Sequence, residues 1–136
     1  MPKRIYTDGV FDLFHANHLA LLREAKSLGD YLIVGVASDL MTSSYKRRPI
    51  IPETERLAII SAIDCVDEAH LIDGLPTAET LEKILAQHQI DLVVYAGDST
   101  PDFYAPAEAR GIMRRLPYHD GVSTSAIISR IKSRQT

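Results

Sequence analysis

Two histidines three residues apart are the side chains in this sequence with the clearest potential for chemistry. His15 and His18 lie in the segment HANH, immediately before apolar residues that recur at helical spacing. This spacing places both imidazoles on one side of a helix start, beside backbone N–H groups that have no partner within the helix. Such a helix start attracts anions, phosphate above all. We therefore expect a phosphate site here.

A second expected helix start carries hydroxyl groups. The segment HDGVSTS, residues 119–125, places Ser123, Thr124 and Ser125 shortly after Gly121, which lets the backbone approach a ligand. Two helix starts that face one crevice suit a polyphosphate better than a single phosphate. The same hydroxyls could also form only a helix cap, without any ligand.

Apolar runs alternate with helical patterns along the 136 residues. The sequence predicts strands over residues 3–7, 31–37, 66–72, 92–96 and 112–117. Helices are expected from about His15 to Gly29, after Pro52, from Thr77 to about His88 and from Ser123 to Lys132, with loops over residues 38–49 and 99–110. This alternation predicts an α/β fold: a Rossmann-like single domain over residues 1–136, with a parallel five-stranded sheet covered by helices on both faces. Ligands would then bind beyond the carboxyl ends of the strands.

The composition is that of an ordinary soluble globular protein. Apolar residues make up 46% and charged residues 24% of the chain. The formal net charge of -3 gives no electrostatic reason to expect a nucleic-acid partner. The single Cys65 cannot form an internal disulfide. Because no signal peptide or membrane-spanning stretch is recognisable, we expect a cytoplasmic protein with no membrane partner.

The segment GVFDLFHANH resembles the first signature of the small cytidylyltransferases, within the nucleotidyltransferase superfamily that carries the His-x-Gly-His motif. The segment GVSTS resembles their second signature, RTEGIST, and the likeness covers nearly the whole chain. The resemblance implies transfer of CMP from CTP to a small phosphorylated or phosphonate alcohol, with release of pyrophosphate. It also implies Mg²⁺ as the companion of the triphosphate, and a homodimer.

The same resemblance implies a role for individual residues. His15 and His18 would donate to the phosphates in the transition state, and Lys46 would bind both reacting phosphates. Contacts to the phosphate of the acceptor are expected from Lys46, Arg56 and Arg114. Nucleotide contacts are expected from Gly9, Val10, Phe11, Asn17, Asp98, Gly121, Ser123, Thr124 and Ser125. Asp12 matches an acid of the first signature with a structural or metal-related role, and no residue is assigned as a metal ligand.

Departures from the family pattern keep two alternatives open. Asn17 stands where the motif has glycine, and Tyr118 stands where the second signature has arginine. A nucleotide-binding protein without catalysis is therefore one alternative. The other is an adenylyltransferase that uses ATP, because RPIIPETERLAIISAIDCVD and YHDGVSTS also resemble the heptose-phosphate adenylyltransferases. His70 and His88, which stand apart from these motifs, are expected to be structural or exposed.

Overall fold

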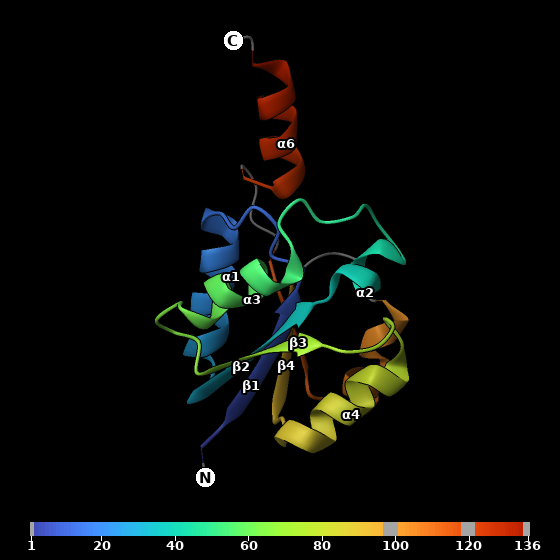
Figure 1. Ribbon diagram of the computed structural model, residues 1–136. Helices are drawn as coiled ribbons and strands as arrows, with labels where there is room; N and C mark the ends of the chain where they lie inside the picture. Colours follow the sequence, from blue (N-terminus) through green and yellow to red (C-terminus); the bar gives the residue numbers. More distant parts are fainter. Residues whose placement is uncertain (1, 97–100, 118–121, 135–136) are drawn as a thin grey trace.

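A computed structural model describes residues 2–96, 101–117 and 122–134 (Figure 1). The strands are β1 (Arg4–Gly9), β2 (Tyr31–Ala37), β3 (Glu68–Ile72), β4 (Leu92–Ala96) and β5 (Met113–Leu116). They form one sheet in the order β3-β2-β1-β4-β5, in which every neighbouring pair is parallel. The helices are α1 (Ala16–Ser27), α2 (Asp39–Ser43), α3 (Glu53–Ser61), α4 (Ala78–His88), α5 (Ala105–Ala109) and α6 (Thr124–Ser133), with the 3-10 helix η1 (Asp102–Tyr104).

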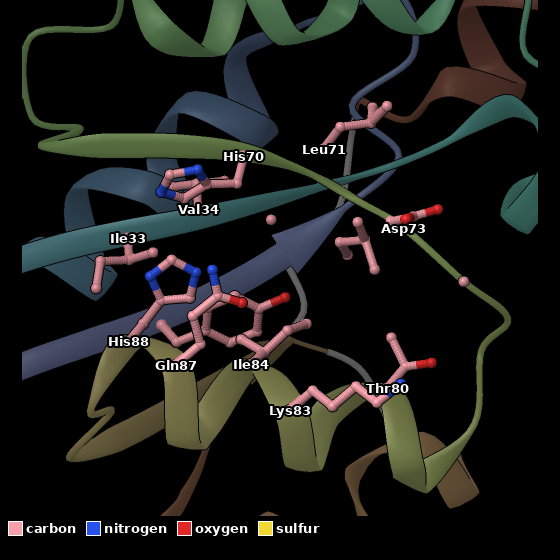
Figure 2. Close-up of a pocket in the computed structure, with 14 residues that line it drawn as sticks. Ile33, Val34, His70, Leu71, Asp73, Thr80, Lys83, Ile84, Gln87 and His88 are labelled. Atoms are coloured by element: carbon pink, nitrogen blue, oxygen red, sulfur yellow. The ribbon is translucent and has the colours of Figure 1, made fainter.

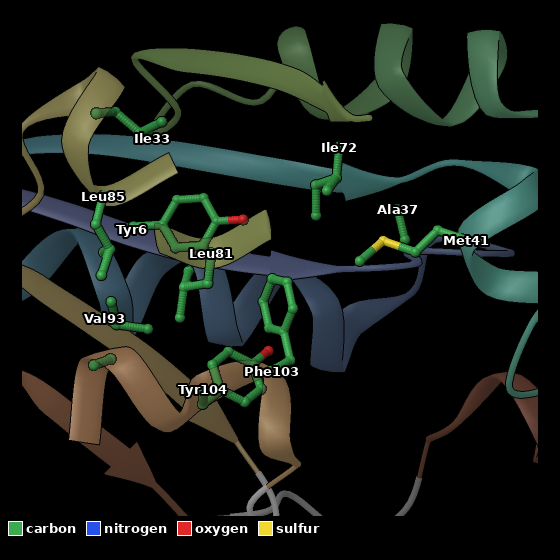
Figure 3. Close-up of a cluster of buried hydrophobic side chains, with 11 residues drawn as sticks. Tyr6, Ile33, Ala37, Met41, Ile72, Leu81, Leu85, Val93, Phe103 and Tyr104 are labelled. Carbon is green, nitrogen blue, oxygen red and sulfur yellow. The ribbon is translucent and has the colours of Figure 1, made fainter. Parts of the chain in front are cut away.

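Helices cover both faces of the sheet, which confirms the predicted α/β architecture. On one face, Ile60 of α3 packs with the strand residues Ile5 and Val34, and α1 lies beside α3. On the other face, Leu81 of α4 packs with Tyr6 of β1, and residues of η1 and α5 complete the cluster (Figure 3). A cavity of about 440 Å³ also lies on this face, between α4 and the strands β2 and β3 (Figure 2).

The last helix stands apart from these layers. It contains no buried residue and extends beyond the carboxyl end of β1 (Figure 1). Among the described helices, none is both long enough and apolar enough to cross a membrane.

The bounds of the strands follow from burial and pairing. β2 and β4 coincide with the apolar runs YLIVGVA and LVVYA, whose continuous hydrophobicity suits a strand buried on both faces. β1 continues two residues beyond its expected end, because Asp8 and Gly9 still pair with Gly35 and Val36 of β2. The strand thereby carries its polar last residues to the end of the sheet where ligands bind in such folds.

Two segments expected to be loops contain short helices. α2 forms within residues 38–49, where Oγ of Ser38 accepts a hydrogen bond from N–H of Met41 at 3.0 Å and Met41 and Thr42 are buried. η1 and α5 form within residues 101–110, where Phe103 and Ala107 join the core beneath α4. The expectation of loops was therefore wrong at these positions, because a single cap and a few buried contacts stabilise helices too short to show periodicity.

Candidate active site

The turn between β1 and α1 brings the two predicted histidines together. His15 immediately precedes α1, His18 lies in its first turn, and their rings stack with 3.7 Å between centroids. The rings of Phe11 and Phe14 pack against His18. Phe11 and Leu13 have φ angles of 56° and 50°, a region that side chains rarely adopt. The strained turn, held by packing, fixes the position of the imidazoles.

His18 is a neutral hydrogen-bond donor in this arrangement. The backbone N–H of His15 donates to Nδ1 of His18 at 3.2 Å, which leaves the ring proton on Nε2. Burial, together with the charges of His15 and Lys46, lowers the pKa of His18 to about 4, although Asp12 opposes this shift. Burial also lowers the pKa of His15. The Nε2–H of a neutral His18 can therefore donate to a phosphate oxygen near neutral pH.

The start of α6 meets the start of α1, which confirms that the two expected helix starts converge. Oγ1 of Thr124 donates to the backbone oxygen of Asp12 at 2.9 Å and lies 3.5 Å from Nε2 of His15. Nδ2 of Asn17 donates to the backbone oxygen of Val122 at 2.5 Å. Asn17 thus joins the first turn of α1 to the segment before α6.

A small polar cavity of about 130 Å³ lies between these helix starts and the loop after α2. His18 lines it from α1, Thr124 from α6, and Lys46 and Arg47 from the loop. Nη1 of Arg47 donates to Oγ of Ser125 at 3.4 Å, so this cation reaches the first turn of α6. Cations, an imidazole and a hydroxyl group at two helix starts form a site that can bind phosphate groups.

A larger cavity of about 570 Å³ lies at the carboxyl ends of β1 and β4. Asp8 lines it together with Tyr45 and Tyr104. The carboxylate of Asp8 accepts hydrogen bonds from the hydroxyl of Tyr6, at 2.9 Å, and from the hydroxyl of Tyr104. Burial raises the pKa of Asp8 to about 6, although the two hydrogen bonds lower it. The larger cavity therefore combines a partly protonated acid with tyrosine side chains.

Lys46 lines both cavities and so links them. Its backbone N–H donates to the oxygen of Thr42 at 3.0 Å, which continues the turn of α2 up to the lysine. Desolvation and the neighbouring Arg47 lower the pKa of Lys46, while Asp12 raises it. A cation in this position can contact a ligand in either cavity, or two ligands at their junction.

Asp12 fixes the far end of the loop that carries Lys46. Its two carboxylate oxygens accept hydrogen bonds from the backbone N–H groups of Ile50, at 2.8 Å, and Ile51, at 2.9 Å. The carboxylate is buried and both oxygens are engaged. This geometry supports a structural role for Asp12 rather than a metal-related one.

Arg56 does not reach either cavity. Its guanidinium is buried and donates to the backbone oxygens of Ile51, Val10 and Ala37 at 2.7 to 2.8 Å. Nη2 also pairs with a carboxylate oxygen of Asp39 at 2.6 Å. The prediction that Arg56 contacts the acceptor phosphate is therefore corrected: in this structure it connects β1, β2 and the loop before α3.

Arg114 is likewise not brought to the cavities. It is exposed on the edge strand β5, in register with Val94, which packs on the face that α1 and α3 cover. Arg115 pairs with Tyr95 instead, and its guanidinium lies 5.8 Å from the ring of Tyr95, which lines the larger cavity. Because neighbouring residues of a strand point to opposite faces, Arg115 is the arginine on the cavity side.

The remaining predicted residues divide into three groups. Gly9 and Val10 line the cavities and Phe11 is buried beside them. Oγ of Ser123 accepts from N–H of Ala126 at 3.0 Å, so this hydroxyl caps α6, as one reading of the sequence allowed. The predicted Asp98 and Gly121, and Tyr118, lie outside the described residues.

Sequence reasoning missed several residues that line these cavities, among them Asp8, Arg47 and Tyr104. Asp8 follows the strand expected over residues 3–7, and an acid at the end of a buried strand is itself a signal. Arg47 belongs to neither signature, and only its contact with Ser125 places it at the helix start. No local pattern identifies Tyr104, because its contact with Asp8 joins residues 96 positions apart.

This chain is similar to one protein family and to several curated proteins. The profile of the family described as cytidylyltransferase-like matches residues 6–130. Ethanolamine-phosphate cytidylyltransferase of Arabidopsis thaliana is 36% identical, over 96% of this chain and 32% of its own. The bifunctional protein HldE of Edwardsiella ictaluri is 39% identical, over 98% of this chain and 28% of its own. This chain thus spans about a third of the length of these curated relatives.

A solved structure has the same fold over most of the chain. The crystal structure of the lipopolysaccharide core biosynthesis protein from Thermoplasma volcanium superposes with a TM-score of 0.74 at 31% identity. The superposition covers 88% of this chain and 100% of the archaeal one.

Proposed function

This chain belongs to the cytidylyltransferase-like family, and from that premise we propose that it transfers CMP from CTP to a small phosphorylated or phosphonate alcohol. Pyrophosphate is the second product. The observation that carries the proposal is the convergence of His18, Thr124 and Lys46 on one polar cavity, with Lys46 also lining the larger cavity beside it. The triphosphate occupies the first cavity and the acceptor enters the second.

In the proposed reaction, an oxygen of the acceptor phosphate attacks the α-phosphorus of CTP. A new P–O bond forms, the bond from the α-phosphorus to the bridging oxygen breaks, and its electron pair leaves with pyrophosphate. Nε2–H of His18 donates to the phosphate oxygens as negative charge develops, and Lys46 neutralises charge on both reactants. Positioning and charge stabilisation then supply most of the rate, as is usual in transfer between phosphates.

The lining of the larger cavity supports this class of acceptor. Lys46 provides a cation for the phosphate or phosphonate, and Asp8 provides an acceptor for a hydroxyl or other hydrogen-bond donor at the opposite end of the molecule. Tyr45 and Tyr104 also line this cavity, and Tyr104 donates to Asp8. A small alcohol that carries one anionic group and one donor group fits this arrangement.

Mg²⁺ accompanies the triphosphate in this proposal. Both oxygens of the carboxylate of Asp12, which lines the small cavity, accept backbone N–H groups. The ion would therefore be held by phosphate oxygens and water, as Mg²⁺ commonly is. Its contribution is to neutralise charge on the phosphates.

We propose a cytoplasmic homodimer that acts on small molecules, without a nucleic-acid or membrane partner. The formal net charge of -3 supports the absence of a nucleic-acid partner.

The proposal is tested by incubating the chain with CTP, Mg²⁺ and a panel of acceptors that includes choline phosphate, ethanolamine phosphate and glycerol 3-phosphate. Release of pyrophosphate that depends on one acceptor is the expected result. No release with any acceptor, together with no binding of CTP in calorimetry, would refute it.

Two alternatives have distinct outcomes in the same experiments. The resemblance of RPIIPETERLAIISAIDCVD and YHDGVSTS to the heptose-phosphate adenylyltransferases favours ATP as the other candidate nucleotide. Stronger protection against thermal unfolding by ATP than by CTP would support it. Asn17 occupies the position of the motif glycine, and its side chain donates a hydrogen bond to the backbone oxygen of Val122. This structural contact favours the second alternative, a nucleotide-binding protein without catalysis. That alternative predicts saturable nucleotide binding without turnover, and it predicts that Asn17→Gly does not create turnover.

A further inference from the structure

Three side chains of metal-binding type meet at the end of the sheet opposite to the two cavities. Glu68 begins β3, His70 follows two residues later, and His88 is the last residue of α4. One ligand atom from each residue lies within 4.8 Å of the other two. Figure 2 shows His70 on the strand and His88 on the helix, with their rings turned toward one another.

The distances between these three side chains are close to those between the ligands of one metal ion. Nε2 of His70 lies 2.8 Å from Oε1 of Glu68, and the rings of His70 and His88 stack at 4.7 Å between centroids. Zinc takes two imidazole nitrogens and a carboxylate oxygen at about 2.0–2.2 Å, so small side-chain rotations admit an ion between the three. We propose that Glu68, His70 and His88 bind one divalent transition-metal ion of the zinc class.

A second layer of hydrogen bonds orients the carboxylate for this role. The hydroxyl of Tyr31 donates to Oε2 of Glu68 at 2.6 Å, so Oε1 remains directed to His70. Arg4 lies 3.8 Å from the same Oε2, and its Nε donates to the backbone oxygen of His88 at 2.8 Å. Arg4 thus holds both the helix end and the carboxylate in place, while its charge works against a neighbouring cation. Such outer contacts are the usual support of metal ligands.

The ion would have a structural effect. β3 is an edge strand of the sheet, and the three ligands would join it to the end of α4 across the cavity shown in Figure 2. The side chain of His70 is 47% exposed, which leaves room for water as a fourth ligand. Because the three ligands lie at the opposite end of the sheet from the small and the larger cavity, this inference does not depend on the proposed reaction.

The test measures binding of Zn²⁺ to the metal-free chain by calorimetry, with the visible absorption of bound Co²⁺ as a second readout. We expect one ion per chain and a higher melting temperature in the presence of Zn²⁺. His70→Gln removes a ligand from an exposed position and should weaken binding by well over tenfold, with an unchanged circular dichroism spectrum. Tyr31→Phe keeps all three ligands and should weaken binding about tenfold, since it removes only the hydrogen bond that orients Glu68.

The other histidine pair supplies the matched control. The double variant His15→Gln, His18→Gln should bind Zn²⁺ with wild-type affinity, because these imidazoles belong to the phosphate site. Loss of binding in this double variant, unchanged binding in His70→Gln, or no saturable binding by the wild-type chain would each overturn the inference.

Discussion

Replacing Asp8 by asparagine is expected to stabilise the protein at neutral pH and to stabilise it much less in acid. The amide keeps the shape of the side chain and can still exchange hydrogen bonds with the hydroxyls of Tyr6 and Tyr104. It removes the negative charge that burial disfavours. The comparison therefore isolates the cost of ionising this one carboxyl group.

The size of the effect follows from the pKa of Asp8, which burial raises from 3.8 to about 6. A raised pKa means that the folded chain binds the proton more tightly, so stability from this group is lost as pH rises between these two values. At about 1.4 kcal/mol per pH unit, ionisation costs up to about 3 kcal/mol above pH 7 and about 1 kcal/mol at pH 4.5. Because Asp8 is partly open to the cavity, we expect a gain of about 1.5–3 kcal/mol for Asp8→Asn at pH 7.5.

Urea unfolding of wild type and Asp8→Asn at pH 4.5 and pH 7.5 measures this difference. Asp73→Asn is the matched control, because Asp73 is exposed immediately after β3 and should show no such gain. A variant that is no more stable than wild type at pH 7.5, or that gains equally at both pH values, would refute the argument. The same variant should also lose activity toward the acceptor while it retains binding of the nucleotide.

Four further substitutions test the site and the fold. His18→Ala should lower kcat by about 10²–10³-fold in pyrophosphate release, because a donor to the developing charge is lost, with little change in the unfolding midpoint. Lys46→Ala should lower kcat and raise KM for both substrates, because this side chain lines both cavities. Asp12→Asn should lower the free energy of unfolding by about 1–3 kcal/mol in urea titrations, because an amide N–H would face a backbone N–H. Gly35→Ala should lower it by a similar 1–3 kcal/mol, because the added Cβ would lie 2.3 Å from the hydroxyl of Tyr6.

A control variant tests the two activity predictions, and each of the four predictions has a result that would contradict it. Arg48→Ala alters an exposed cation two residues from Lys46 and should leave activity unchanged. Loss of activity only a few-fold in His18→Ala or Lys46→Ala would mean that these side chains merely line the cavity. Wild-type unfolding curves for Asp12→Asn or Gly35→Ala would show that the loop or the tyrosine relaxes without cost.

The parts of this protein that could be predicted from sequence are those set by short-range patterns. The continuous apolar runs of β2 and β4 identify buried strands directly, and the spacing of His15 and His18 places both rings at a helix start. The convergence of that helix start with α6 also followed, because strands of a parallel sheet end at a common edge.

The rest depends on tertiary contacts that no local pattern reveals. Arg56 directly follows the polar residues Glu53 to Glu55 in the sequence, yet its buried guanidinium donates to backbone oxygens from three segments. Tyr104 becomes part of a cavity only because η1 brings its hydroxyl to Asp8. His70 and His88 are unremarkable in the sequence, and only the packing of α4 beside β3 brings them together.

The segment that carries Lys46 and Arg47 is attached to the fold at both ends, which has a consequence for how the lining of the cavities can change. At one end, Ser38 caps α2 and the side chains of Met41 and Thr42 are buried. At the other end, the carboxylate of Asp12 accepts hydrogen bonds from the backbone of Ile50 and Ile51. Substitutions at the other positions of residues 44–49 can therefore alter the lining of the larger cavity, to which Tyr45 belongs, while both ends of the segment stay in place. Lys46 and Arg47, which line the small cavity, would keep their positions under such changes.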